Sequence, residues 1–133
     1  YKIGTIKHAS SKFDLDKKRK DSWRHRQAGA DTVVVASAGK IAMVKNESHV
    51  TLDDLEKYFP DMDIIITEGF KKESKPKIEV FRAEKHRKPL CPGDNNLIAF
   101  VTNTQQKLSV PTFGLEEIKK LATFIEKKYL TAS

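Results

Sequence analysis

The sequence has little cysteine and no long hydrophobic run. Cys91 is the single cysteine among 133 residues, so no disulfide can form within the chain. A lone thiol fits a reducing compartment, and we expect a cytoplasmic location. No stretch approaches the roughly 20 consecutive apolar residues that a membrane-spanning helix needs. These features argue against a disulfide scaffold and against a membrane-spanning protein.

Patterns that bind metals or form nucleophilic sites are also missing. The four histidines are scattered, without a His-x-x-x-His or Cys-x-x-Cys pair. Cys91 lies in a proline-containing stretch with no evident base nearby in sequence, which argues against a cysteine nucleophile. Asp14 and Asp16 alternate in a polar stretch and could help hold a cation, although such pairs more often only solvate a loop. We therefore predict no catalytic residue.

The charge balance favours anionic partners. A net charge of +7 and a pI near 9.5 suit nucleotides, nucleic acids, phosphorylated cofactors or acidic protein surfaces. The densest basic cluster runs from Lys17 to Lys20. Aromatic residues make up 8% of the chain and do not alternate with the basic runs, as a platform for single-stranded nucleic acid would require. A basic nucleic-acid-binding domain is therefore the least favoured alternative.

Hydrophobic periodicity and turn residues predict alternating strands and helices. We expect strands at 1–8, 32–36, 41–44, 64–67, 77–82, 97–102 and 110–113, and helices at 21–28, 51–59 and 115–130. Asp21 and Thr51 are suitable N-caps, and Gly29 is a suitable left-handed C-cap. The turn at Ala38 and Gly39 predicts an antiparallel hairpin from Thr32 to Val44.

Burial is predicted from the same pattern. The runs 32–36 and 64–67 are apolar and β-branched, so we expect buried strands, with 64–67 central in a mainly parallel sheet. The inward face of the last helix is expected to comprise Leu115, Ile118, Ala122, Ile125 and Tyr129. No repeat or domain boundary is evident. The fold class is therefore α/β, in one layered domain covering residues 1–133.

Candidate binding residues follow the predicted strands, because ligands collect at the carboxyl ends of parallel strands. These residues are Lys7 with His8, Glu68 with Gly69, and Thr102 with Asn103. An acid directly after an Ile-Ile-Ile-Thr strand stands where P-loop nucleotidases hold Mg²⁺. A glycine beside it lets the backbone approach a phosphate. The alternative is that Glu68 simply begins a solvated loop.

The first predicted helix is a second candidate. Asp21, Arg24 and His25 share one face, and Ser22 lies near the helix start. Arg24 can form a forked contact with phosphate, and His25 can hydrogen-bond a phosphate or a carboxylate. Spacing alone makes an exposed, salt-bridged helix the more common outcome.

Taken together, these segments resemble the molybdopterin-guanine dinucleotide biosynthesis protein B family. The stretches that carry the resemblance are 4–8, 13–16, 20–30, 63–71 and 76–80, and it continues weakly through 97–101 and 110–113 into the last helix. The resemblance implies a three-layer fold like that of P-loop NTPases, with a mainly parallel sheet. It implies a protein that binds GTP with Mg²⁺, hydrolyses it weakly at most and commonly forms a homodimer.

The resemblance also implies a partner and a set of site residues. The family assists the guanylyltransferase that joins GMP to molybdopterin. The implied nucleotide- or pterin-binding residues are Lys7, His8, Asp21, Ser22, Arg24 and His25, with Glu68 and Gly69 as the Walker B pair and Glu68 at the metal.

One expected motif is not in the sequence. Family members open with a strand, a Gly-x-x-x-x-Gly-Lys-Ser/Thr loop and a helix, and this chain has no such loop. Since the chain starts at Tyr1 without methionine, we expect about 30 residues, a strand–loop–helix unit, to precede it. Without that loop the chain should bind GTP poorly, and the sheet should be left with an apolar gap or an unpaired edge. Residues 102–105 also lack a guanine-reading motif, so a docking adaptor without nucleotide remains an alternative.

Overall fold

The computed structural model describes residues 1–131 and forms two compact units, Tyr1–Gly69 and Phe70–Ser133. The first contains four strands and two helices, and the second contains three strands and one helix. Each unit is described by itself, and the single domain over 1–133 stays a prediction. No helix in the described part of the chain is long and apolar enough to cross a membrane.

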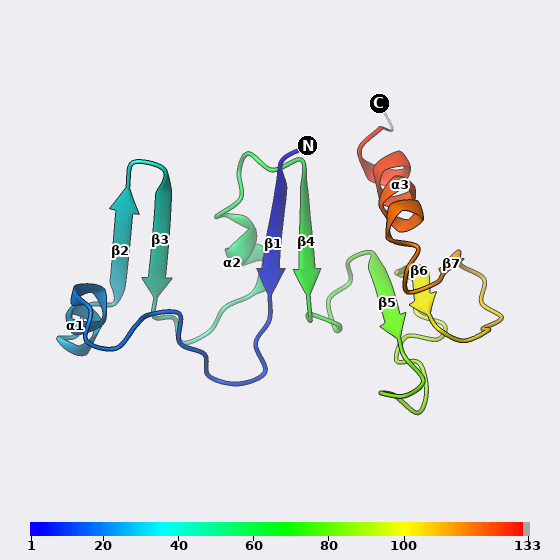
Figure 1. The fold of residues 1–133 in the computed structure, drawn as a ribbon, viewed down its shortest axis with the longest axis horizontal. Helices are drawn as coiled ribbons and strands as arrows, with labels where there is room; N and C mark the ends of the chain where they lie inside the picture. Colours follow the sequence, from blue (N-terminus) through cyan, green and yellow to red (C-terminus); the bar gives the residue numbers. More distant parts are fainter. Residues whose placement is uncertain (132–133) are drawn as a thin grey trace. The chain divides into compact units, whose positions relative to one another are not determined.

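A pair of parallel strands organises the first unit. β1 (Ile3–Lys7) pairs with β4 (Ile64–Glu68), with Ile3 opposite Ile64 and Lys7 opposite Glu68. The two strands run side by side in Figure 1. Gly4 permits close packing here, because a Cβ at this position would lie 2.6 Å from Phe59 Cδ1. The parallel register brings both carboxyl ends to the same level.

The expectation that residues 64–67 form a buried central strand is wrong. Ile64 and Ile65 are half-buried, and Ile66 is 48% exposed. Among the described residues β4 hydrogen-bonds to β1 alone, so its other edge is unpaired. A strand with a neighbour on one side only leaves part of its surface to solvent. The unpaired edge itself was expected from the sequence.

The hairpin forms as predicted but is not buried. β2 (Thr32–Ser37) and β3 (Lys40–Lys45) are antiparallel around Ala38 and Gly39. Val33 is buried, whereas Val34 and Val35 are 55% and 53% exposed. The prediction of a buried strand at 32–36 is therefore wrong, because a two-stranded ribbon (Figure 1) has few neighbours to cover its faces.

Two short helices complete the first unit. α1 (Asp21–Gln27) has Lys20, not Asp21, at its N-cap, and Gly29 follows it with φ of 102° as predicted. α2 (Leu52–Glu56) has the expected Thr51 cap, which forms a capping box with Asp54. It ends before Phe59, because the amide of Phe59 donates to the Glu56 carbonyl three residues back and tightens the last turn.

The second unit contains a parallel sheet in the order β5 (Lys77–Phe81), β6 (Leu97–Thr102), β7 (Thr112–Phe113). The central strand β6 is the most buried, and its Phe100 packs with Phe81 and Leu97 in the core. All three strands were predicted. Together with the hairpin and the β1–β4 pair, they confirm an α/β fold with mostly parallel sheets.

The last helix, α3 (Ile118–Tyr129), faces its sheet with other residues than expected. Ile118 is 69% exposed and Tyr129 41%, and Ala122 is exposed as well, so the predicted inward face is wrong at these three positions, whereas Leu115 and Ile125 are half-buried. Phe124 instead packs on Phe113, with ring centroids 5.7 Å apart. The helix begins after a turn in which the Gly114 amide donates to the Glu117 carboxylate at 2.8 Å.

Candidate functional site

Four predicted residues meet at the carboxyl ends of β1 and β4. Lys7 Nζ lies 2.5 Å from Glu68 Oε1. The amide of His8 donates to the Glu68 carbonyl at 2.8 Å, which extends the parallel pairing by one residue. Gly69 has φ of 93°, and a Cβ there would lie 2.7 Å from His8 Cβ. Glycine is therefore required at this position by both backbone conformation and space.

The Lys7–Glu68 pair is exposed and free to exchange partners. The side chains are 68% and 71% exposed, and ion pairs at such positions contribute at most about 1 kcal/mol. Lys7 can therefore pair with a phosphate, and Glu68 can bind a cation, with little loss of protein stability. No group of three or more His, Cys, Asp or Glu residues in the described chain is arranged to hold a metal by itself. Mg²⁺ commonly uses one or two carboxylates together with phosphate oxygens and water.

The α1 candidates lie elsewhere in the first unit. Arg24 lies 3.7 Å from Asp21 in an exposed pair within the helix. The hydroxyl of Ser22 donates to Asp16 Oδ1 at 2.8 Å. Figure 1 shows α1 beside the base of the hairpin, away from the ends of β1 and β4. The structure thus divides the predicted site residues into two groups, with Asp21, Ser22, Arg24 and His25 apart from the strand-end cluster.

Arg26 was not predicted, and it explains the acidic pair before α1. Its Nη2 donates to Asp14 Oδ1 at 3.0 Å, and its Nε lies 3.4 Å from Asp16 Oδ2 without a hydrogen bond. The side chains of Arg26 and Asp16 are 20% and 12% exposed. A hydrogen bond from the Asp16 amide, and then Arg26, lower the pKa of Asp14. The cation between these two aspartates is the Arg26 guanidinium. Because Arg26 belongs to α1, these contacts attach the loop before α1 to the helix.

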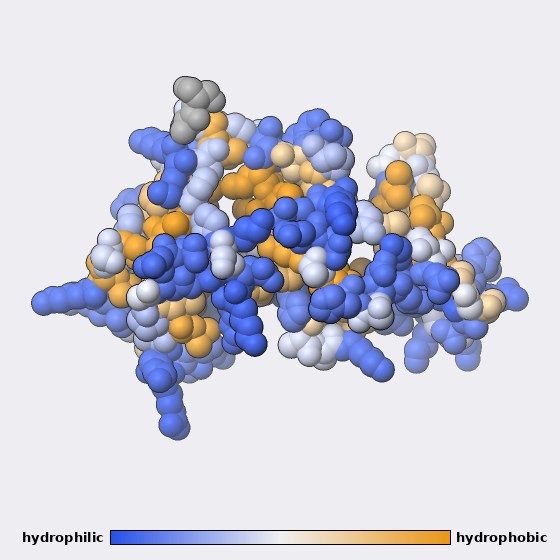
Figure 2. Space-filling model, turned by 180° about the vertical axis from the view of Figure 1, so that it is seen from behind, coloured by the Kyte–Doolittle hydropathy of each residue, from blue (hydrophilic) through white to orange (hydrophobic). Residues whose placement is uncertain are grey.

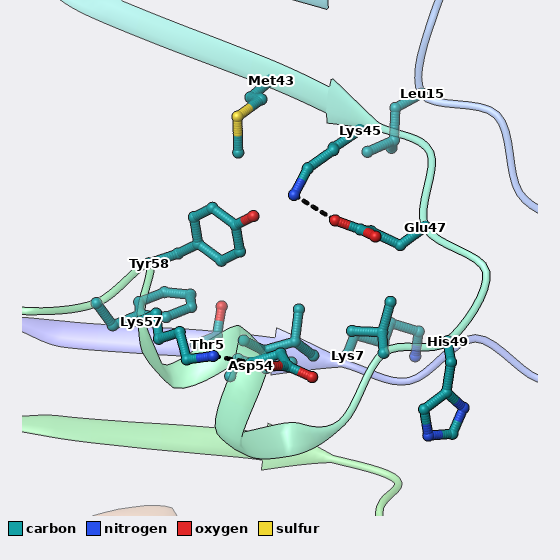
Figure 3. A pocket seen from close by; sticks show the side chains of 14 residues that line it. Thr5, Lys7, Leu15, Met43, Lys45, Glu47, His49, Asp54, Lys57 and Tyr58 are labelled. Atoms are coloured by element: carbon teal, nitrogen blue, oxygen red, sulfur yellow. Dashed lines mark hydrogen bonds and ion pairs between the residues drawn. The ribbon is translucent and has the colours of Figure 1, made fainter. Parts of the chain in front are cut away.

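The first unit contains a pocket of about 800 Å³ that the sequence did not reveal. β1, β3, the segment before α2 and α2 itself surround it (Figure 3). Of the predicted site residues only Lys7 lines it. The other lining residues are Thr5, Ile6, Leu15, Met43, Lys45, Glu47, His49, Val50, Asp54, Leu55, Lys57, Tyr58 and Phe59.

Two ion pairs set the charge of this pocket. Lys45 contacts Glu47, a contact that raises the pKa of Lys45, with a smaller contribution from Tyr58. Lys57 Nζ lies 2.8 Å from Asp54 Oδ1, and Lys57 and Thr51 hold the pKa of Asp54 well below its usual range. Two ion pairs therefore line this pocket, and most of its other lining residues are apolar. No short motif announces this arrangement, since its residues come from segments far apart in the sequence.

The third pair of predicted strand-end residues has a structural role in the second unit. Thr102 is buried, and its hydroxyl oxygen accepts from the Thr104 amide at 3.1 Å. Asn103 Nδ2 donates to Glu84 Oε2 at 2.8 Å. These contacts tie together the segments that follow β5 and β6.

Glu79 on β5 is a buried acid that sequence reasoning passed over. It accepts hydrogen bonds from the amides of Leu90 and Cys91 at 2.5 and 2.9 Å. Burial, and then the charge of Glu79, raise the pKa of the Cys91 thiol. A protonated thiol is a poor nucleophile.

Comparison with known proteins identifies the family. The family described as molybdopterin guanine dinucleotide synthesis protein B matches residues 1–103. The chain belongs to this family. The molybdopterin-guanine dinucleotide biosynthesis adapter protein of Haemophilus influenzae is 34% identical over 128 residues, 94% of this chain and 71% of that protein. The adapter protein of the same name from Escherichia coli is 33% identical, with 92% of this chain and 73% of that protein covered.

Solved structures agree with the fold. A crystal structure of molybdopterin-guanine biosynthesis protein B superimposes with a TM-score of 0.73 at 27% identity, covering 96% of this chain and 80% of that one. The Bacillus subtilis MobB structure has a TM-score of 0.71 at 23% identity, with 98% and 81% covered. The second likeness concerns the fold alone. The family and the α/β fold expected from the sequence are both confirmed.

Proposed function

We propose that this protein is an adapter in the synthesis of molybdopterin-guanine dinucleotide and that it binds Mg²⁺–GTP at the carboxyl ends of β1 and β4. Nucleotide binding is supported by one observation: Lys7, Glu68 and Gly69 lie together at the same end of the β1–β4 sheet. The pathway comes from the family and from the names of the two relatives. The proposal includes weak GTP hydrolysis at most, as the family resemblance implies.

Each strand-end residue has a role in this proposal. Lys7 contributes a positive charge to a phosphate oxygen, as a point charge on a flexible stem. Glu68 supplies a carboxylate oxygen to Mg²⁺, a hard cation that prefers oxygen ligands. Gly69, in its left-handed conformation, leaves the backbone open to the phosphates. His8 lies beside Gly69, and in this proposal it donates a hydrogen bond to the same phosphates.

The partners follow from the same pathway. We propose that the chain acts on the guanylyltransferase that joins GMP to molybdopterin, and that it contacts molybdopterin and a second copy of itself. A net charge of +7 suits an acidic partner surface and phosphorylated ligands. A cytoplasmic location completes the proposal, and the free thiol of Cys91 is compatible with it.

The test replaces Glu68 with glutamine in the protein. Glu68→Gln keeps the shape of the side chain and removes its charge, so we expect Mg²⁺-dependent GTP affinity to fall by roughly tenfold or more. The exposed pair contributes little to folding, so the melting temperature should stay within about 2 °C. Calorimetric titration with Mg²⁺–GTP and thermal melts measure the two effects.

Glu73→Gln is the matched control, because Glu73 is also exposed and lies outside the strand-end cluster. It should leave GTP affinity unchanged. If Glu68→Gln binds Mg²⁺–GTP as tightly as the control, Glu68 is not in the site.

A docking adaptor without nucleotide is the second candidate, favoured by the word adapter in the relatives' names. It predicts stimulation of the guanylyltransferase that neither added GTP nor Glu68→Gln alters. Stimulation assays on the same variants separate the two candidates.

A further inference from the structure

The segment Arg82–Leu90, which we call the basic loop, follows β5 at the carboxyl end of the strand. Its first seven positions carry four lysines or arginines and a single acid, Glu84. Every residue of the loop is exposed except Pro89, which is half-buried. In Figure 1 this part of the chain continues past the arrowhead of β5. A dense group of cations therefore projects from the second unit.

Asn103 holds the start of the basic loop. Its Oδ1 accepts from the amide of Ala83 at 3.3 Å, and its Nδ2 donates to Glu84 Oε2 at 2.8 Å. Because Asn103 directly follows β6, these bonds attach the loop to the neighbouring strand. The second bond also occupies one oxygen of the loop's single carboxylate, which could otherwise neutralise the cations around it.

Glu79 holds the end of the basic loop. This buried residue of β5 accepts hydrogen bonds from the amides of Leu90 and Cys91, one at each carboxylate oxygen, at 2.5 and 2.9 Å. Hydrogen bonds to an ionised carboxylate are stronger than those between neutral groups. The basic loop is therefore fastened at both ends to the sheet of the second unit.

Between its two ends the basic loop makes a tight turn that leaves the later cations free. The amides of Lys85 and His86 both donate to the Arg82 carbonyl at 3.0 Å. The His86 ring lies 6.5 Å from the Phe81 ring, measured between centroids, so this side chain is turned toward the end of β5. Among the described residues, no ion pair involves Arg87 or Lys88.

The chemistry of the basic loop fits an acidic protein surface better than a nucleic acid. Cations at an interface steer association with a surface of opposite charge. Leu90, 64% exposed, adds an apolar contact that a phosphate backbone would leave unused. The loop has no Phe, Tyr or Trp on which a base could stack. Because the loop is already held in one conformation, binding costs less conformational entropy.

We propose that the basic loop docks on an acidic surface of a partner protein, with Arg87 and Lys88 contacting carboxylates and Leu90 making an apolar contact beside them. Asn103 acts as a positioning residue for the loop. Under the proposed function the partner is the guanylyltransferase, and the inference rests on that function in naming it.

The test measures association and dissociation rates of the protein with the guanylyltransferase over a salt series. Arg87→Ala with Lys88→Ala should lower the association rate constant by about tenfold and reduce its dependence on salt. The matched control, Lys127→Ala with Lys128→Ala, removes two exposed cations from α3 of the same unit. It should leave the association rate constant within about twofold.

Two single substitutions test the apolar contact and the positioning residue. Leu90→Ala should raise the dissociation rate by about threefold to tenfold without altering the salt dependence, whereas Ile118→Ala, at an exposed apolar residue of α3, should not. Asn103→Ala releases the start of the loop without changing the net charge. It should lower affinity by about threefold to tenfold and keep the salt dependence, and Asn95→Ala, at another exposed amide between β5 and β6, is its control.

The outcomes separate the docking proposal from the proposed function. Wild-type rates and salt dependence in the Arg87→Ala, Lys88→Ala variant overturn the docking proposal and leave the nucleotide site untouched. Glu68→Gln should bind the guanylyltransferase normally, so a failure of the nucleotide site is seen separately. A wild-type protein that does not bind the guanylyltransferase overturns the partner in both proposals.

A nucleic acid is the other outcome of the same experiment. A short DNA duplex that binds more tightly than the guanylyltransferase, and that loses affinity in the Arg87→Ala, Lys88→Ala variant, overturns the assignment to a protein surface. Far-ultraviolet circular dichroism on each variant confirms folding. Lys85→Ala with Lys88→Ala is the second variant of the loop and should show the same loss of association rate if the first proves unstable.

Discussion

At the scale of single residues, the first unit depends on side chains whose partners are distant or oppositely charged. Arg26 contacts Asp14 and Asp16 and fastens the loop between β1 and α1. Gly69 holds a left-handed backbone beside His8. A substitution of Arg26 would leave the two aspartates without their partner, because the guanidinium is largely removed from solvent. A substitution of Gly69 would bring a Cβ into collision with His8.

The capping box of α2 supports a prediction about stability and pH. Thr51→Ala removes the side chain that accepts from the Asp54 amide, and we expect a loss of about 1 kcal/mol in the free energy of unfolding. Urea titration of the wild type and the variant at pH 7 measures it. A change within experimental error would mean that α2 does not depend on its cap.

The pH dependence of the same box has a definite sign. Lys57 and Thr51 lower the pKa of Asp54 in the folded state. The contribution of Asp54 is therefore present at pH values above its ordinary pKa of 3.8 and is lost as the pH falls through the lower folded value. The difference in stability between wild type and Thr51→Ala should narrow as the pH is lowered below about 4.

At the scale of elements, the open question is whether α1, a basic helix apart from the strand ends, binds a ligand. Arg24 and Asp21 form an exposed pair at 3.7 Å, so replacing Arg24 and His25 by alanine should change stability by less than about 0.5 kcal/mol. If these side chains contact GTP or pterin, affinity should fall by roughly 1.5–3 kcal/mol. Those two ranges differ enough to separate a binding surface from an ordinary one.

We expect the Arg24→Ala, His25→Ala double variant to lose ligand affinity and to keep its melting temperature. Titration of the protein with Mg²⁺–GTP and with a pterin phosphate provides the measurement, and Lys127→Ala with Lys128→Ala on α3 is a control with two exposed basic residues removed. Normal affinity and normal stimulation of the guanylyltransferase would leave α1 as solvated surface.

At the scale of the whole molecule, the basic charge predicts weak, salt-sensitive binding to any polyanion. Hydrophilic residues predominate on the face shown in Figure 2, and the net charge is +7. A short DNA duplex should therefore bind with a dissociation constant of about 10⁻⁴–10⁻⁶ M at physiological salt, and more weakly as salt is added. Fluorescence anisotropy over a salt series measures this. A sequence-dependent constant near 10⁻⁸ M would revive the nucleic-acid alternative.

Much of this molecule was readable from the sequence. Cap and turn residues predicted α2 and the hairpin, and apolar runs predicted β4 and β6, because these signals act over a few neighbouring residues. The pairing of Lys7 with Glu68 was partly foreseen, since both follow strands whose carboxyl ends meet in a parallel sheet. The motif stretches also pointed to the correct family.

Only the tertiary structure decided which side chains are buried and which residues the charged side chains contact. Ile66 and Val34 have the sequence pattern of core residues but remain about half exposed, since burial depends on what packs against a strand. Arg26 and Glu79 look like ordinary charged residues until the fold brings Asp14 to one and the Leu90 amide to the other. The pocket formed by β1, β3 and α2 joins segments remote in the chain, and no local pattern can encode a contact between side chains that only long-range packing brings together.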